Sequence, residues 1–387
     1  MIKASKIESL SKTPIDKSWS FSDKTIKHTA YITHGYYTYP AKFIPQLAAR
    51  IITENSKEGD SVIDPFMGSG TTIVEAIVNK RIGIGIDVNE VAYLLAKVKS
   101  TPINSVELAK EFLNIQNDLS KRLNGKHEKY LNEATKRIPI NGRIDYWFPE
   151  VQKSKLLVIL DRILEIKNND IKNFFLVSFA QILKSCSIWL QKSVKPTRDF
   201  SKKISDPHRL FITKTKKMIR KHDEFNSTIT ENIKKEIDKY RIVECGDSRN
   251  LPCEDNTATL IVTSPPYVTS YEYADLHQLP SLWFNYLDEL SKFRKKFIGS
   301  TYRNREEIDL KSIIADDIVS NLKNKKSEGV RNYFADMLES FIEMKRVLRK
   351  GGRVAIVIGN TKFNGVEILN AEVFKEQFEN TLYKIAV

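Results

Sequence analysis

The sequence predicts a doubly wound α/β fold, with a mostly parallel sheet that is interrupted by one large, mainly helical insertion. Short apolar runs alternate with helical patterns near both ends of the chain. A glycine-rich turn and a Pro-Pro turn each follow such a run directly, whereas residues 101–239 lack the alternation and carry helical periodicity. Because alternating strands and helices form crossover connections, we expect parallel strands that bind ligands at their carboxyl ends.

The expected elements fall into two blocks, one on each side of the insertion. The first block has a helix over residues 40–56, a strand over 61–64, a helix after the glycine-rich turn, a strand over 81–87 and a helix to residue 100. The second has strands over 240–247 and from 257, a helix over 331–350 capped by Gly351 and Gly352, a strand over 353–360, a helix over 372–381 and a last strand over 383–387. Residues 31–100 and 240–387 thus form the predicted sheet domain, and residues 1–30 a loosely held arm.

The charge of the chain favours a polyanionic partner. Its 387 residues carry a net charge of +14, and residues 184–221 alone hold 12 Lys or Arg against two acids. A second basic cluster spans residues 292–305, and a solvated lysine-rich surface is the alternative for either cluster alone. We expect no membrane span, secretory signal or metal site, because apolar runs are short and the three cysteines form no ligand pattern. A reduced, cytoplasmic protein is the simplest interpretation.

The glycine-rich turn, DPFMGSGTT at residues 64–72, has the properties of a cofactor site without a phosphate contact. Its spacing fits neither the dinucleotide pattern GxGxxG nor the phosphate loop GxxxxGK[ST], which argues against a nicotinamide dehydrogenase. Asp64 beside the turn would repel a pyrophosphate but would suit an ammonium group. Asp87 ends the next strand, at a position that commonly binds ribose hydroxyls. The expected cofactor therefore carries a ribose and an amino acid.

The Pro-Pro turn, TSPPY at residues 263–267, suits the activation of an amino group. Two prolines remove two backbone donors and fix two φ angles, which leaves nearby carbonyls as fixed acceptors. The amino nitrogen of a base is a poor nucleophile until fixed acceptors hold its N–H protons, and Ser264 Oγ and the Pro265 carbonyl suit that task. Tyr267 would stack on a base that has left the duplex. The catalytic candidates are Ser264, Pro265, Pro266 and Tyr267, which act by positioning rather than through a metal.

DPFMGSGT resembles the cofactor motif of the amino-methylating DNA methyltransferases, and HGYYTYPAKFIP at residues 34–45 is similar to the segment that precedes their first strand. The resemblance implies a Rossmann-like fold that binds S-adenosylmethionine. It also implies that Asp64, Gly68 and Gly70 line the methionine end of this cofactor. Asp87 would hold the ribose, and Asp247 would approach the adenine amino group. The further cofactor-binding candidates are Tyr39, Lys42, Pro65, Phe66, Ser69 and Thr71.

SPPY resembles the catalytic tetrapeptide of the N4-cytosine enzymes, whereas adenine-N6 enzymes more often have Asp in place of Ser264. The sequence therefore favours a site-specific methyltransferase that acts on the N4 of a flipped cytosine in duplex DNA, with N6-adenine as the alternative. A DNA-binding subunit that keeps the cofactor fold without turnover is the second alternative. C5-cytosine methylation is disfavoured, because Cys253 precedes the strand and no partner glutamate motif is evident. The resemblance alone suggests a cognate restriction endonuclease as a partner.

The insertion is the candidate target-recognition region, because its second half is basic. Lysines there would neutralise phosphates, and one or two arginines could read guanines. The insertion precedes Asp247 rather than following it, which departs from the usual pattern of the family. The DNA-binding candidates are Lys195, Arg198, Lys202, Lys203, Arg209 and Lys214, with Arg294 and Arg303 from the second basic cluster.

Overall fold

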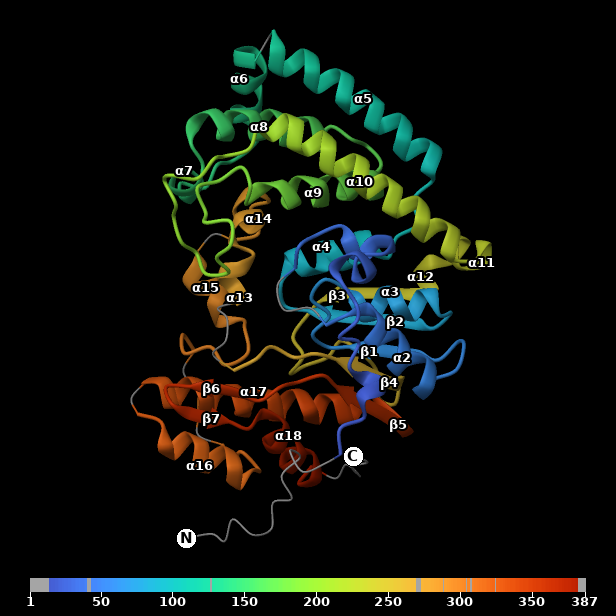
Figure 1. The fold of residues 1–387 in the computed structure, drawn as a ribbon, viewed down its shortest axis with the longest axis vertical. Helices are drawn as coiled ribbons and strands as arrows, with labels where there is room; N and C mark the ends of the chain where they lie inside the picture. The colour runs from blue at the N-terminus through green and yellow to red at the C-terminus, as the bar shows by residue number, and fades with distance from the viewer. Residues whose placement is uncertain are drawn as a thin grey trace.

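A parallel sheet of five strands lies at the centre of the fold, in the order β3-β2-β1-β4-β5 (Figure 1). The strands are β1 (Ser61–Asp64), β2 (Ile82–Asp87), β3 (Arg241–Cys245), β4 (Ala258–Thr263) and β5 (Leu348–Ile356). The predicted α/β class is confirmed, and each of the five strands corresponds to a predicted one. The strand order reverses between β1 and β4, and such a switch point opens a crevice at the carboxyl ends of the strands.

The structure is a computed structural model that describes residues 14–39, 43–125, 127–268, 273–287, 289–303, 305–306, 308–323 and 325–381. The predicted cofactor residue Lys42 and the predicted strand over 383–387 lie outside the described residues. Trp19 belongs to the predicted N-terminal arm, and its ring centre lies 3.7 Å from the guanidinium of Arg50 on α2. This part of the arm therefore packs on the sheet domain.

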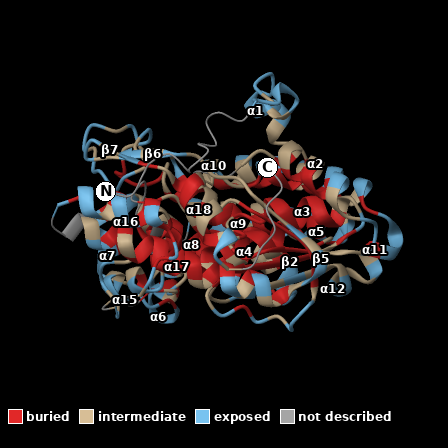
Figure 2. Cartoon of the chain, turned by 90° about the horizontal axis from the view of Figure 1, so that it is seen from below, coloured by how far each residue is buried: buried red, intermediate tan, exposed pale blue. Residues whose placement is uncertain are grey.

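The three central strands β1, β2 and β4 are buried on both faces because their apolar side chains alternate between two helical layers, whereas the edge strands β3 and β5 are partly exposed. Val62 of β1 packs in one cluster with Ile52, and the adjacent Ile63 packs in another with Phe341. The helices and short 3-10 turns around the sheet are η2 (Lys17–Trp19), α1 (Ile26–Thr29), η3 (Ile32–Gly35), α2 (Pro45–Asn55), α3 (Thr71–Val78), α4 (Glu90–Lys99), α16 (Ile313–Asn321), α17 (Lys325–Val347) and α18 (Asn370–Glu379). Figure 2 shows the buried residues gathered in the interior between these elements.

Two details near the C-terminus differ from the sequence prediction. The helix expected to reach residue 350 ends at Val347, and Gly351, with φ 79°, lies within β5 beside a register shift instead of capping the helix. Pairing with β4 therefore continues across the glycines. A hairpin of β6 (Thr361–Phe363) and β7 (Val366–Ile368) was not predicted, although Asn364-Gly365, both with positive φ, is a strong hairpin signal.

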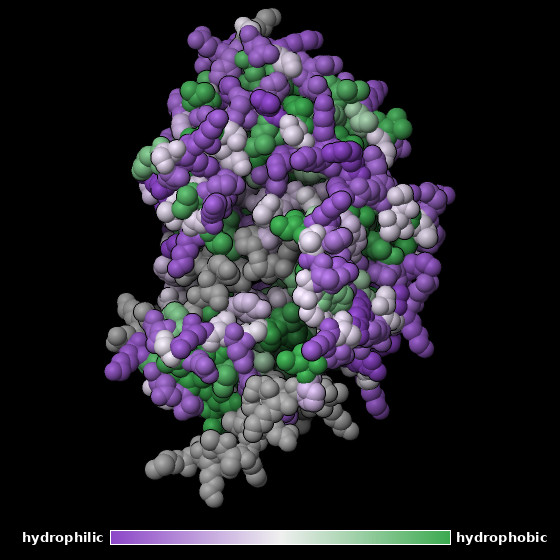
Figure 3. All heavy atoms as spheres, viewed as in Figure 1, coloured by the Kyte–Doolittle hydropathy of each residue, from purple (hydrophilic) through white to green (hydrophobic). Residues whose placement is uncertain are grey.

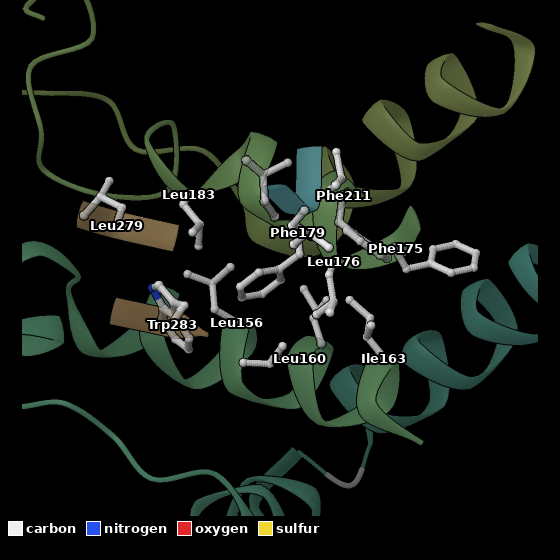
Figure 4. Close-up of a cluster of buried hydrophobic side chains, with 14 of the residues drawn as sticks. Leu156, Leu160, Ile163, Phe175, Leu176, Phe179, Leu183, Phe211, Leu279 and Trp283 are labelled. Atoms are coloured by element: carbon white, nitrogen blue, oxygen red, sulfur yellow. The ribbon is translucent and has the colours of Figure 1, made fainter. Parts of the chain in front are cut away.

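The chain between α4 and β3 is helical, as predicted: its residues 105–228 form a layer at the top of Figure 1, whereas its residues 231–240 lie beside the sheet. Its helices are α5 (Ser105–Asn124), α6 (His127–Arg137), α7 (Arg143–Trp147), α8 (Glu150–Leu164), α9 (Asn169–Leu183), α10 (Pro207–Thr228), α11 (Glu231–Lys235) and α12 (Ile237–Tyr240). The segment after β4 adds α13 (Tyr273–Leu276), α14 (Gln278–Trp283) and α15 (Leu290–Lys295). Figure 4 shows that Leu279 and Trp283 of α14 enter the apolar core that Leu156 of α8 and Phe179 of α9 form.

One buried imidazole joins the two ends of this helical layer. The Ile103 N–H donates to Nε2 of His222 at 2.9 Å, and Nδ1 of His222 lies 2.9 Å from Tyr36 Oη. Because Nε2 accepts, Nδ1 carries the proton and donates to Tyr36. Burial lowers the pKa of His222 to about 4, so the ring is neutral at pH 7.

Hydrophilic residues predominate over the helical layer in the surface view of Figure 3. Among the described helices, none combines the length and the apolar character that a membrane span needs.

Candidate functional site

A pocket lies where the carboxyl ends of β1, β2 and β4 meet, at the switch point of the sheet. It is lined by Tyr39, Phe43, Asp64, Pro65, Phe66, Met67, Gly68, Ser69, Thr71, Asp87, Val88, Asn89, Asp247, Ser248, Ser264, Pro266, His277, Lys296, Phe297 and Ile298. Residues of the glycine-rich turn and of the Pro-Pro turn therefore line one pocket, as expected from the sequence. Gly70, Pro265 and Tyr267 adjoin lining residues but are not themselves part of the lining.

Asp64 connects the two motifs physically. Its carboxylate is 1% exposed and accepts hydrogen bonds from Thr263 Oγ1 and Thr72 Oγ1, both at 2.7 Å, and from the Phe66 N–H at 3.1 Å. Thr263 is the residue before Ser264, and Thr72 lies in the first turn of α3. The same carboxylate thus fixes the start of the Pro-Pro turn and the helix that follows the glycine-rich turn.

Asp87 shapes the glycine-rich turn from the next strand. Its Oδ2 accepts from the Gly68 N–H at 2.9 Å, and its Oδ1 accepts from the Asn89 N–H at 2.9 Å. Gly68 has φ 48°, and a Cβ there would lie 3.2–3.3 Å from ring atoms of Tyr39, so a glycine is needed for both reasons. The Tyr39 ring therefore covers the turn.

Gly70 and Lys99 hold the rest of the turn against α4. A Cβ on Gly70 would come within 2.8 Å of Ala96, so its contribution is close helix packing. The Lys99 ammonium, 1% exposed, donates to the Ser69 carbonyl at 2.5 Å. The sequence analysis missed Lys99, because a lysine in the last turn of a helix reads as a solvated residue.

Ser264 presents an acceptor to the pocket. Its hydroxyl donates to the Val357 carbonyl at 2.9 Å, which directs the proton away and leaves the oxygen lone pairs available. The Pro266 carbonyl accepts from Tyr333 Oη at 2.8 Å, so it is already engaged. Tyr267 is half-buried, and its hydroxyl is the atom that a Cβ on Gly359 would meet, at 3.8 Å.

Asp247 differs from the other two acids because it carries its own counter-ion. Nε of Arg249 donates to Oδ1 of Asp247 at 2.8 Å, and Arg249 also lies 3.1 Å from the buried carboxylate of Asp336. Burial acts to raise the pKa of Asp247, but the hydrogen bonds and charge of Arg249 outweigh it and lower the pKa. This end of the pocket is therefore electrically compensated.

The glycine-turn end of the pocket favours a cation. Burial raises the pKa of Asp64 and of Asp87 to about 6, and the charge of Asp64 raises that of Asp87 further. Among the residues that the structure describes, no basic side chain contributes to either shift. The expected cofactor carries a sulfonium and an ammonium, which supply the missing positive charge, so the residues present fit this group.

His277 lines the same pocket and was not among the predicted site residues. It is 1% exposed, its ring packs against that of Tyr39 with 4.7 Å between centroids and 33° between the ring planes, and neither ring nitrogen has a hydrogen-bond partner among the described residues. Thr71 Oγ1 is buried without a partner in the same way. The aromatic residues of this segment are the predicted wall of the pocket, and the burial of a lone histidine is not encoded in its neighbouring residues.

The predicted DNA-binding residues fall into two groups. Lys195, Arg198, Lys203 and Arg209 are exposed, and Arg198 lies between the rings of Tyr146 and Phe200 at 4.2 and 4.4 Å. The others have intramolecular roles or are half-buried. Lys202 donates to the Lys184 and Trp189 carbonyls, Lys214 is half-buried, Arg294 pairs with Asp275 and Arg303 with Asp336. Burial and Lys184 lower the pKa of Lys202 to about 8.

Within the described parts of the chain, no group of three or more His, Cys, Asp or Glu side chains is placed to hold a metal ion.

Comparison with known proteins gives one family and several relatives. A family model described as DNA methylase, of the N6/N4 methyltransferase type, matches residues 3–98. That range contains Tyr39, the glycine-rich turn and Asp87. No solved structure matches the chain significantly.

Three relatives match over nearly the whole chain, including the following two. The type II methyltransferase M.MvaI of Kocuria varians is 27% identical, over 92% of this chain and 84% of the relative. The type II methyltransferase M.MjaII of Methanocaldococcus jannaschii is 22% identical, over 95% of this chain and 78% of the relative. The DNA adenine methyltransferase YhdJ of Escherichia coli K12 is 34% identical over 96 residues, which are 24% of this chain and 32% of the relative.

Proposed function

Because the chain belongs to the N6/N4 family of amino-methylating DNA methyltransferases, we propose that it transfers a methyl group from S-adenosylmethionine to the N4 of cytosine at a specific site in duplex DNA. The DNA methyltransferase activity and the cofactor follow from the family. The choice of cytosine, the recognition of a specific site and the residue roles given below are the proposal.

The hydrogen bond from Ser264 to the Val357 carbonyl carries this proposal. It commits the hydroxyl proton, so the oxygen acts towards the substrate as an acceptor only. A neutral acceptor holds one N–H of an amino group and draws the nitrogen towards tetrahedral geometry, which frees its lone pair. The Pro265 carbonyl is the proposed second acceptor, and Tyr267 the stacking partner for a base that has left the duplex.

The cofactor supplies a methyl group that its sulfonium has already activated. Asp64 and Asp87 would bind the cationic and ribose parts, while Asp247 would face the adenine. Through its bond to Thr263, Asp64 also sets the distance between the cofactor turn and Ser264. Positioning of this kind can account for a large part of a rate enhancement without a covalent intermediate.

We assign target recognition to the helical insertion. Its exposed residues Lys195, Lys203 and Arg209 are the proposed phosphate contacts, and Arg198 with its two aromatic neighbours a proposed base contact. The enzyme would act in the cytoplasm, where DNA is accessible. A cognate restriction endonuclease is a proposed partner, since two relatives are type II methyltransferases.

Analysis of the product base tests the choice of cytosine. Purified protein is incubated with duplex DNA and tritiated S-adenosylmethionine, and the DNA is digested to nucleosides. We expect the label in N4-methylcytosine. N6-methyladenine is the second candidate, which the local similarity to a DNA adenine methyltransferase favours, and its appearance would refute the cytosine assignment. DNA that binds but gains no label would identify a subunit without turnover.

A further inference from the structure

His277 is buried at a position where a polar side chain without a hydrogen-bond partner destabilises the fold, unless a ligand supplies that partner. It lies between α13 and α14, is 1% exposed, lines the pocket and has two ring nitrogens without a partner among the described residues. A buried polar group that lacks a partner costs about 1–3 kcal/mol, so folded proteins rarely keep one without a use. Burial lowers the pKa of His277 to about 4, so the ring is neutral and has one N–H to donate.

The position of His277 within the pocket narrows the choice of ligand group. Its ring packs at a tilt against Tyr39, and Tyr39 in turn covers Gly68 of the glycine-rich turn. Asp247, paired with Arg249, follows β3, which lies two strands away from β1 and its glycine-rich turn, and Arg249 also donates to the Lys296 carbonyl at 3.3 Å. His277 therefore belongs to the end of the pocket that receives the amino-acid part of the cofactor.

That amino-acid part needs one group that the two buried acids do not provide. Asp64 and Asp87 suit its positive charges but repel its carboxylate. The carboxylate requires donors, and Thr71 Oγ1 and the His277 ring are the two buried lining side chains near the turn that have no partner among the described residues. A neutral donor can satisfy the carboxylate without cancelling the field that attracts the sulfonium.

We propose that His277 is a cofactor-binding residue whose imidazole N–H donates a hydrogen bond to the carboxylate of S-adenosylmethionine. This inference rests on the proposed function only for the identity of the cofactor. It requires no particular target base and no turnover.

The test compares the binding of S-adenosylmethionine with that of decarboxylated S-adenosylmethionine by calorimetry, without DNA. The natural protein should bind the decarboxylated analogue about 10–100-fold more weakly, as expected for a hydrogen bond to a charged group. In His277→Phe this preference should fall to about threefold or less, whereas His277→Gln, which keeps a donor, should retain part of it. His208→Phe, on α10 outside the pocket, is the matched control and should discriminate like the natural protein.

A stability measurement separates binding from a structural role. The phenyl ring of His277→Phe keeps the ring contact with Tyr39 and removes the two nitrogens that have no partner among the described residues. The ligand-free variant should therefore melt no lower than the natural protein, while its stabilisation by S-adenosylmethionine should shrink.

Two outcomes overturn the inference in distinguishable ways. If His277→Phe discriminates between the two ligands as the natural protein does, His277 does not hold the carboxylate, and a concurrent loss of affinity for DNA with an unpaired target base would make it a base contact instead. If the natural protein binds neither ligand, the proposed function fails together with this inference.

Discussion

Two buried aspartates, one in the sheet domain and one in the helical insertion, differ in how their negative charge is balanced. Asp64 beside the pocket and Asp161 on α8 are 1% and 3% exposed. Asp64 accepts hydrogen bonds from two hydroxyls and a backbone N–H, and no cation of the described part of the chain contributes to its shifted pKa. Asp161 lies 2.5 Å from Arg137 and 3.6 Å from Arg122. The insertion pairs this buried charge with arginines, whereas the described partners of Asp64 are hydroxyls and a backbone N–H, which leaves its negative charge available to a cationic ligand.

The largest effect that we expect comes from Ser264→Ala, which removes the proposed acceptor for the target amine. The kcat for methylation should fall by about 100–1,000-fold, a loss typical of one preorganised hydrogen-bonding group. The affinity for S-adenosylmethionine should stay unchanged, because Asp64 and the glycine-rich turn remain intact. Steady-state kinetics and calorimetry on the same preparation measure both values. A kcat within tenfold of the natural value would contradict the role given to Ser264.

Asp161→Ala tests the other side of the comparison. The change leaves Arg137 and Arg122 with one carboxylate fewer, so the free energy of unfolding should fall by about 3 kcal/mol. Cofactor affinity should not change, because Asp161 lies on α8 and not in the pocket. Urea unfolding provides the measurement, and the exposed Asp170 on α9 is the control, with an expected change within about 0.5 kcal/mol. Equal effects at both positions would argue that the ion network contributes little.

The pH dependence of cofactor binding tests the uncompensated charge directly. A bound cation favours the ionised carboxylates, so affinity for S-adenosylmethionine should rise as the pH increases through about 6, where Asp64 and Asp87 titrate. We expect a gain of about tenfold between pH 5 and 7, levelling off above that. Calorimetry across this range would refute the idea if the affinity did not vary with pH.

Thr263→Val sharpens the same experiment. The Thr263 hydroxyl lowers the pKa of Asp64, so its removal should move the midpoint of the pH profile upwards. Because Thr263 also fixes the start of the Pro-Pro turn, we expect kcat to fall by about tenfold, the equivalent of one ordinary hydrogen bond. Thr263→Ser keeps the hydroxyl and should restore both values. A midpoint that does not move would separate Asp64 from cofactor binding.

The smallest effect concerns two adjacent lysines of the insertion. Lys203 is exposed and Lys202 is tied to two backbone carbonyls. If Lys203 meets a DNA phosphate, Lys203→Ala should reduce the slope of log affinity against log salt by about 0.9. Lys202→Ala should leave that slope unchanged and lower the melting temperature instead. Fluorescence titrations of a duplex at several salt concentrations distinguish the two, and identical slopes would remove Lys203 from the interface.

Residues whose setting is local could be predicted from the sequence. The strand ahead of Asp64, the positive φ at Gly68 and the turn after Thr263 all follow from short patterns, and so does their meeting at one sheet edge. The Asn364-Gly365 hairpin had an equally local signal that the sequence analysis did not use. The early end of α17 had none, since the pairing of β5 with β4 overrides the capping tendency of Gly351.

Residues whose setting depends on distant parts of the chain could not be predicted. From its basic neighbours in the sequence, Arg303 is predicted to contact DNA, but in the fold it binds Asp336, which is 33 positions away. A lysine in the last turn of a helix is expected to lie in solvent, but in the fold Lys99 donates a hydrogen bond to the Ser69 carbonyl. The surroundings of His277 are formed by Tyr39 and by the pocket lining, most of which is distant in sequence. In each case, burial and a partner remote in sequence decide the role, and neither is visible in a window of neighbouring residues.

The placement of α14 has a consequence for engineering. Leu279 and Trp283 follow the Pro-Pro turn in the chain, yet they are packed among the helices of the insertion (Figure 4). A chimera that grafted residues 101–239 from a relative would leave these two side chains facing a foreign set of neighbours. Under the proposed role of the insertion, changing the DNA sequence preference by grafting therefore requires that α14 be exchanged together with residues 101–239.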